Sequence, residues 1–329
     1  MRISRKENVT QMKMKKIISS AGFLLGLLVL LVVSSLFFQP KNNTEEHGME
    51  DVAANGILGE PKQTLDVLFI GDSVSYCSVI PVQIWKEHGI TSYMCGTSLQ
   101  QLYYSKDFLH KVFENQSPKV VVLETTPIFS NFEYKKNIWT AVERVFPVFR
   151  YHDRWKEFGK MLELDTNLKV EYTHWEVNKG YYYSPAIEVV DAGDYTAPTD
   201  EVAGILADNK QTLIEIKEFC EEKGVKLILF SAPNTLTWRP DCHNALVKLS
   251  NELELPYFDM NYMTEEVPID WSKDSFDGGD HLNYYGAQKV TTYLGKYLED
   301  MKLFKDKRKT PEYDFWNKAQ TEFYQEKTE

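Results

Sequence analysis

Two short motifs, about 200 residues apart, contain the residue types that acyl transfer requires. Ser73 follows Gly-Asp directly after an apolar run, and His281 follows Asp277, two glycines and Asp280. A serine hydroxyl attacks an acyl carbon when a histidine takes its proton and a carboxylate orients the imidazole. Either Asp277 or Asp280 can supply that carboxylate while the other caps a helix. We favour Asp277 as the carboxylate that orients the imidazole and keep Asp280 as the alternative.

Each motif also has an ordinary structural interpretation. Gly-Asp-Ser is common turn and helix-capping chemistry, and a lone histidine is more often a surface residue than a base. The chain order, with a serine after the first strand and an Asp/His pair before the last helix, favours the catalytic interpretation.

This pattern resembles the SGNH (GDSL) hydrolase superfamily over about residues 65–300. It is more similar to the membrane-anchored, cell-envelope branch, such as the proteins of alginate O-acetylation and teichoic acid D-alanylation. The resemblance implies a flavodoxin-like, three-layer α/β/α fold with a five-stranded parallel sheet. It also implies Ser73 as nucleophile and His281 as base, with no cofactor.

An oxyanion hole needs two or three N–H donors. The backbone of Ser73 supplies one, and Gly96 in Met-Cys-Gly-Thr-Ser matches the superfamily's second block. The third block usually carries an asparagine, but this chain reads Leu-Glu-Thr-Thr-Pro there, so Thr125 or Thr126 is the expected substitute. Asn283, two residues after His281, is a further candidate for binding substrate.

A second cluster combines aromatic and charged residues. Arg150 and Arg154 lie within the run Phe-Arg-Tyr-His-Asp-Arg-Trp at 149–155. Rings can stack on sugars, and arginines can hold a carboxylate or phosphate, so the cluster can line a glycan groove. The alternative is a structural ion-pair network that ties this region to the sheet.

Strand and helix patterns alternate on either side of an aromatic-rich region. Apolar runs predict five strands, and amphipathic runs between them predict helices that cover both faces of a parallel sheet. We expect strands at 66–70, 90–95, 119–123, 225–230 and 256–259, and helices at 81–88, 99–115, 201–223, 241–253 and 287–301. Residues 131–207 break the alternation and are expected to be an insertion that caps one side of the site.

The N-terminus predicts a membrane anchor. Residues 17–38 are uncharged and rich in Leu and Val, long enough to span a bilayer. The six basic residues before them place residues 1–16 in the cytoplasm and the catalytic domain outside the cell. A cleaved signal peptide is the alternative. We expect a linker at 39–64, the SGNH-like domain at 65–301 with its insertion, and a tail at 302–329.

Charge and cysteine content limit the classes of ligand that the protein is expected to bind. The net charge is −11; residues 1–16 carry six basic residues and one acidic, which leaves −16 for the rest. An acidic ectodomain argues against nucleic acid. The four cysteines show no spacing typical of a metal site.

The residues predict a serine O-acyltransferase or esterase. The resemblance to the cell-envelope branch implies a cell-envelope polysaccharide as the substrate and a membrane-bound O-acyltransferase as a partner. One rival is a plain hydrolase that deacetylates glycan. The other is a non-catalytic glycan-binding or scaffold protein, which the missing third-block asparagine supports.

Overall fold

The structure is a computed structural model that describes residues 2–164 and 169–326. Its centre is a parallel sheet in the order β2-β1-β3-β4-β5, which is the flavodoxin-like doubly wound order. The strands are β1 (Val67–Gly71), β2 (Ser92–Gly96), β3 (Val120–Glu124), β4 (Lys226–Ser231) and β5 (Tyr257–Asp259). The predicted fold class and all five strands are confirmed, each within one or two residues of the expected bounds.

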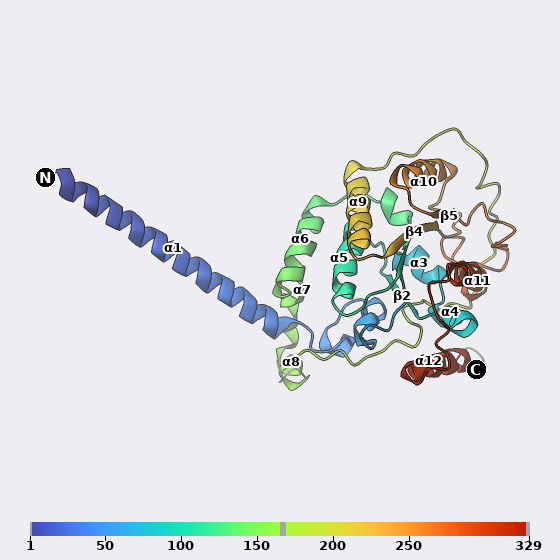
Figure 1. Cartoon of the computed structure of the whole chain (residues 1–329), viewed down its shortest axis with the longest axis horizontal. Helices are drawn as coiled ribbons and strands as arrows, with labels where there is room; N and C mark the ends of the chain where they lie inside the picture. Colours follow the sequence, from blue (N-terminus) through green and yellow to red (C-terminus); the bar gives the residue numbers. More distant parts are fainter. Residues whose placement is uncertain (1, 165–168, 327–329) are drawn as a thin grey trace.

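Helices cover both faces of the sheet, as Figure 1 shows. Alternate strand residues point to opposite faces, so β1 sends Leu68 and Ile70 into one core cluster and Val67 and Phe69 into the other. The first cluster packs under α5 (Leu102–Phe113), α9 (Ala207–Glu222) and α10 (Pro240–Leu253). The second packs under α3 (Ser73–Ser78), α4 (Pro81–His88) and α11 (Tyr284–Asp300).

The stretch predicted as a linker differs from that expectation. Residues 39–64 fold against the domain as η1 (Glu45–His47), α2 (Val52–Asn55) and η2 (Gly56–Gly59). Met49, Ala54, Ile57 and Glu60 are buried. Small apolar residues spaced among the glycines and asparagines give this stretch enough apolar surface to pack, so it is part of the domain rather than a spacer.

The C-terminal tail is also part of the core. After η5 (Pro311–Tyr313), helix α12 (Asp314–Gln325) packs on α4 and buries Trp316 and Phe323 completely. The rings of Trp85 and Trp316 lie 5.5 Å apart. Each large aromatic side chain removes much apolar area from water, which fixes the helix in place.

The insertion has a helical half and an irregular half. After η3 (Thr126–Phe129) come α6 (Tyr134–Val145), α7 (Val148–Tyr151), η4 (His152–Glu157) and α8 (Phe158–Leu164). Residues 169–206 then form no helix or strand. This irregular half runs along the edge of β2 and past the end of the sheet, where the N–H of Met94 donates to Lys179 O and that of Tyr182 donates to Tyr76 O, both at 2.9 Å.

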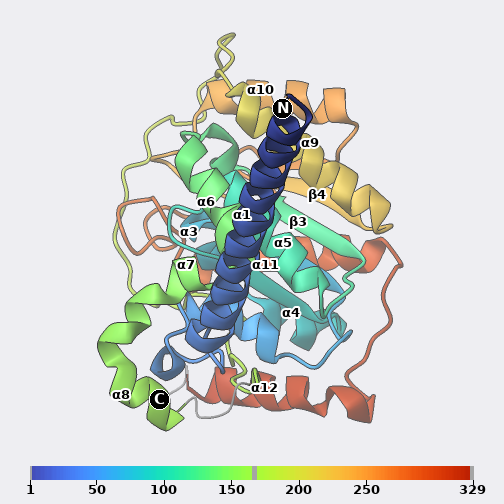
Figure 2. The ribbon, with the colours of Figure 1, turned by 90° about the vertical axis from the view of Figure 1, so that its left-hand side faces the viewer.

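Helix α1 (Arg2–Phe38) extends away from the globular part (Figures 1 and 2). Within Gln11–Phe38, an 18-residue stretch has a mean hydropathy of 2.6, and no other helix in the described residues is long and apolar enough to cross a membrane. Length and composition of this kind fit an anchor or a signal sequence.

Candidate active site

Ser73 is the first residue of α3, at the carboxyl edge of the sheet. Strand β1 ends at Gly71, and the Asp72 side chain then caps the helix by accepting from the N–H of Val74 at 3.0 Å. The N–H at the first position of a helix has no intrahelical acceptor. The half-buried Ser73 therefore presents a hydroxyl and a backbone donor at one point.

His281 is held by Asp277. Its Nδ1 lies 2.5 Å from Asp277 Oδ2, and its backbone N–H donates to Asp277 Oδ1 at 2.8 Å. Gly278 and Gly279 both have positive φ, 78° and 94°, a conformation that other residues rarely adopt. This left-handed pair turns the chain and returns the imidazole to the carboxylate.

Asp280 has a different environment. Its Oδ2 is 3.7 Å from His281 Nδ1, and its Oδ1 accepts from Asn234 Nδ2 at 3.0 Å. The same amide nitrogen donates to the backbone oxygen of Asp280 at 2.7 Å. Of the two carboxylates that the sequence leaves open, Asp277 is therefore the one that holds the imidazole. Asp280 is instead hydrogen-bonded to the loop after β4.

The other imidazole nitrogen is unpartnered. His281 Nε2 is buried and has no hydrogen-bond partner, so the bond to the Ser73 hydroxyl stays a prediction. The side chain is 15% exposed, and the ring stacks on Phe276 with centroids 5.8 Å apart. A buried nitrogen without a partner is unusual in folded proteins, and such an atom is available to take a proton from a reacting group.

The site contains several carboxyl groups, and burial raises the pKa values of two of them. Burial raises the pKa of Asp72 to about 6, although the hydrogen bond from Val74 and the charge of His281 oppose that rise. Burial, and then the charge of Asp72, also raise the pKa of Glu124, which ends β3 and is 1% exposed.

Gly96 lies directly against the Ser73 turn. A Cβ at this position would come within 3.1 Å of the backbone oxygen of Asp72 and 3.2 Å of Ser75 Oγ. Glycine is needed for this close approach of backbone to backbone. The structure thus brings Gly96 close to Asp72 and Ser75, on either side of Ser73, and the oxyanion hole stays a prediction.

Thr125 does not fit its predicted role. Its N–H donates to Phe230 O at 3.1 Å, and its hydroxyl is 2.6 Å from Ser231 Oγ. Thr126 is also occupied, because both its N–H and its hydroxyl donate to Glu124. The carboxyl group of Glu124 thus takes the Thr126 donors, and Phe230 and Ser231 of β4 occupy the polar groups of Thr125.

Asn283 is a structural residue rather than a substrate ligand. It caps α11 by accepting from the N–H groups of Tyr285 and Gly286 at 3.0 and 3.2 Å. Its amide donates to the backbone oxygens of Ala186, Lys273 and Ser275, and the residue is fully buried. These contacts fix the start of α11 two residues after His281.

The two arginines lie in different places. Arg150 pairs with Glu50 at 2.8 Å and donates to Tyr104 OH at 3.1 Å. It lines a cavity of about 500 Å³ that also contains Thr97 and Ser98. Arg154 instead donates to Phe38 O, at the end of α1. The predicted groove therefore retains Arg150 only, and that residue also belongs to an ion-pair network.

A second cavity joins the first at Asp51, Thr97 and Ser98 and reaches Gly96. Its volume is about 520 Å³. Ring-bearing side chains along the two cavities are Tyr76, Tyr103, Tyr104, Trp139, Phe149, Tyr181, Tyr182 and Tyr183. The arrangement is an extended groove, rich in rings and carboxylates, that reaches Tyr76 and Gly96.

Sequence reasoning missed several residues of this site. Asp72 was treated as a turn residue, and Asn234 and Glu124 were given no role. The Ser-Ala-Pro-Asn run after β4 was a usable signal for Asn234, because carboxyl ends of parallel strands meet at one edge. Tyr76 carries no local signal, since only the fold brings it to the groove.

Neither the protein-family models nor the curated proteins compared with the chain gave a match. Solved structures with a similar fold include a GDSL-like lipase from Bacteroides thetaiotaomicron, at 14% identity and a TM-score of 0.35, covering 76% of this chain and 99% of that one. The psychrotrophic esterase EstA from Pseudoalteromonas sp. is 8% identical, with a TM-score of 0.39 and coverages of 72% and 97%. An acetyl xylan esterase is 13% identical, with a TM-score of 0.38 and coverages of 71% and 100%. At such low identities and scores, the function has to come from this chain's own site.

Proposed function

We propose that this protein is a serine-dependent O-acyltransferase or esterase of the SGNH type, acting on a cell-envelope polysaccharide outside the membrane. The single observation that carries the proposal is His281. Its Nδ1 is bonded to Asp277, while its buried Nε2 has no hydrogen-bond partner. An imidazole so arranged has one nitrogen fixed by a carboxylate and the other available as a base.

The chemistry follows from these positions. As Ser73 Oγ forms a bond to the acyl carbon, its proton passes to His281 Nε2, and the N–H groups of Ser73 and Gly96 stabilise the oxyanion. The proton then goes to the departing alkoxide when the ester C–O bond breaks. A sugar hydroxyl or water attacks the acyl-enzyme and gives its proton to Nε2, which returns it to Ser73 Oγ as the bond between the acyl carbon and Oγ breaks.

The groove supports a polysaccharide as the acceptor. Two joined cavities of about 500 Å³ each exceed the needs of a short acyl group. Their tyrosine and tryptophan rings suit stacking on sugars, and the acidic surroundings suit a neutral or amphoteric glycan. Helix α1, retained as an anchor with residues 1–16 in the cytoplasm, would hold the site near a membrane-bound O-acyltransferase that exports the acyl group.

Acceptor-dependent turnover tests this proposal. The full chain in detergent is given p-nitrophenyl acetate with and without a de-acetylated envelope glycan, and nitrophenol release and glycan acetylation are followed. A transferase releases nitrophenol faster when glycan is present and acetylates it; a plain hydrolase is indifferent to the acceptor. If the wild type matches the Ser73→Ala variant in both assays, the protein is a non-catalytic glycan-binding or scaffold protein.

A further inference from the structure

Helix α6 exposes apolar side chains and directs polar ones toward the domain, the reverse of a normal amphipathic surface helix. Ile138 and Val145 are seven residues apart, two helical turns, so they form an apolar stripe along one side of the helix. Both are exposed, with Ile138 65% and Val145 63% accessible. A soluble helix normally buries such a stripe against its own core.

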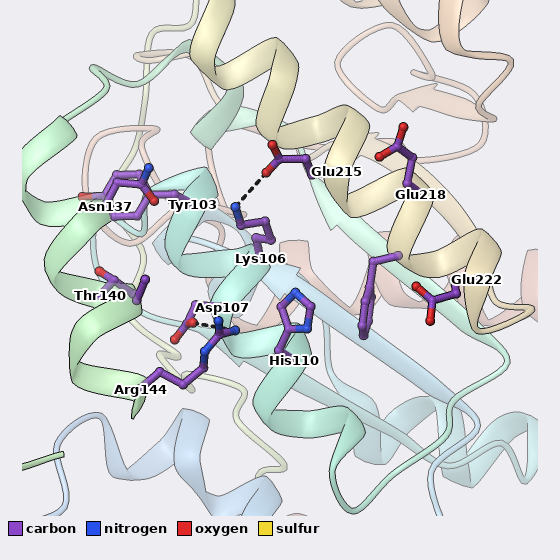
Figure 3. A pocket seen from close by; sticks show the side chains of 12 residues that line it. Tyr103, Lys106, Asp107, His110, Asn137, Thr140, Arg144, Glu215, Glu218 and Glu222 are labelled. Carbon is purple, nitrogen blue, oxygen red and sulfur yellow. Dashed lines mark hydrogen bonds and ion pairs between the residues drawn. The ribbon is translucent and has the colours of Figure 1, made fainter. Parts of the chain in front are cut away.

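The inner side of α6 is polar. Asn137, Thr140 and Arg144 point toward α5 and α9 across a cavity of about 340 Å³ (Figure 3). Arg144 Nη1 lies 3.1 Å from Asp107 Oδ1, and on the far wall Lys106 pairs with Glu215 at 2.7 Å. The helix is thus attached to the domain through charges and polar groups, while its apolar stripe faces outward.

The same group of helices is fastened to the end of α1. Arg154 Nη1 donates to Phe38 O at 2.6 Å, and the N–H of Val148 donates to Ser35 Oγ at 3.3 Å. The ring of Phe37 contacts that of Phe158 at 6.0 Å. Contacts from α7, η4 and α8 therefore hold the last turn of the apolar helix at a fixed place on the domain.

Figure 1 shows α6, α7 and α8 as the part of the globular domain nearest to α1, and Figure 2 shows them on the side from which α1 extends. Further apolar side chains are exposed beside that junction: Trp155, Phe158 and Leu162. Tryptophan and phenylalanine rings collect at membrane–water interfaces, as do arginines and lysines near the ends of spanning helices.

Charge distinguishes this region from the rest of the chain. Residues 133–164 contain seven Lys and Arg against five Asp and Glu, within a protein of net charge −11. A helix with an outward apolar stripe and nearby basic residues is typical of segments that lie in the plane of an anionic membrane surface.

We propose that the α6 stripe, together with Phe158 and Leu162 of α8, rests in the headgroup region of the membrane that α1 enters. The domain is then held against the lipid at a fixed height and orientation, instead of hanging from a flexible tether. The inference needs α1 to be retained in the membrane, but it does not depend on the acyl chemistry proposed for Ser73.

Spin labels on the full chain in nanodiscs of phosphatidylcholine and phosphatidylglycerol test this inference. The native cysteines are all buried, so single labels are introduced by Ile138→Cys and, independently, by Val145→Cys. Leu236→Cys is the matched control, because Leu236 is 61% exposed and lies in the loop after β4. Leu28→Cys on α1 reports whether the anchor itself is inserted.

Collisions with oxygen, which concentrates in lipid, are compared with collisions with a water-soluble nickel chelate. We expect labels 28, 138 and 145 to favour oxygen and label 236 to favour nickel. If label 28 favours oxygen while labels 138 and 145 behave like label 236, the proposed contact between α6 and the membrane is refuted. If 138 and 145 meet neither reagent, a protein contact such as a second copy covers the stripe, and the lipid assignment is wrong. If label 28 favours nickel, the anchor is not inserted and the inference fails with it.

Discussion

The loop that carries His281 and helix α6 both lie outside the sheet, yet they are built in opposite ways. In the loop, Ser275 Oγ accepts from Gly279 N, Asn234 holds Asp280, and the Asn283 amide meets three backbone oxygens. Helix α6 has no buried residue and directs its apolar side to the exterior. The loop forms its hydrogen bonds within the protein, and this fixes the position of a chemical group. Helix α6 leaves apolar side chains exposed, and this suits contact with a surface outside the protein.

The largest expected effect separates the two carboxylates of the loop. Asp277→Asn should lower kcat/KM by about 10⁴-fold, the size of the loss that the same change causes in trypsin, because an amide fixes the wrong imidazole tautomer. Asp280→Asn is the matched control and should change kcat/KM by less than about tenfold, since Asn234 holds that residue away from Nδ1. Equal losses in the two variants would mean that both carboxylates orient the base.

The next effect concerns the stability of the Ser73 turn. The pKa of Asp72 is raised from 3.8 to about 6 in the folded protein, so folding favours its protonated form. As pH rises from about 4 through 6, the unfolded chain loses this proton first, and the wild type loses about 3 kcal/mol of stability that stays lost above pH 6.

Asp72→Asn removes that titration but keeps an oxygen to cap Val74. Relative to the wild type, the variant should gain about 3 kcal/mol of stability between pH 4 and pH 7, measured by urea unfolding at each pH. A constant difference between variant and wild type across this range would show that the carboxyl is not desolvated in the fold.

A smaller effect tests the left-handed turn of the loop. Gly279 has a φ of 94°, and a Cβ there would meet Thr235 Oγ1 at 2.1 Å. Gly279→Ala should therefore destabilise the protein by about 1–3 kcal/mol and also lower activity, because the turn sets the Asp277–His281 contact. Gly204→Ala, at a glycine with open space around it, serves as the control. Matching stabilities for the two variants would argue against strain in this loop.

The sequence predicted the parallel sheet and the two ends of the site because both signals are local. Buried strands read as apolar runs, and Ser73 and His281 stand in short motifs. The sequence did not predict the packing of 39–64 or of α12, since their few apolar residues bury only through contacts distant in the chain. For the same reason the sequence did not show that the polar groups of Thr125 are already bonded. Its N–H donates to Phe230 O, and its hydroxyl is hydrogen-bonded to that of Ser231.

The smallest stability effect belongs to α6. Ile138→Ser and Val145→Ser should change the free energy of unfolding in detergent by no more than about 0.5 kcal/mol, because neither side chain is buried in the chain itself. Leu294→Ser, in the buried face of α11, is the contrasting variant and should destabilise by several kcal/mol. A loss of several kcal/mol from Ile138→Ser would show that the stripe packs within the protein, which would remove the contrast between the two regions.

The most direct test of the central claim is covalent modification of Ser73. A fluorophosphonate forms a bond from phosphorus to an activated serine oxygen and releases fluoride, so it marks a serine that has a working base. Treated with it and analysed by peptide mass spectrometry, the full-length wild type should carry the phosphonyl group on Ser73, Asp277→Asn should react far more slowly, and Ser73→Ala should remain unmodified. A folded wild type that stays unmodified at Ser73, or reacts at another residue, would contradict the account.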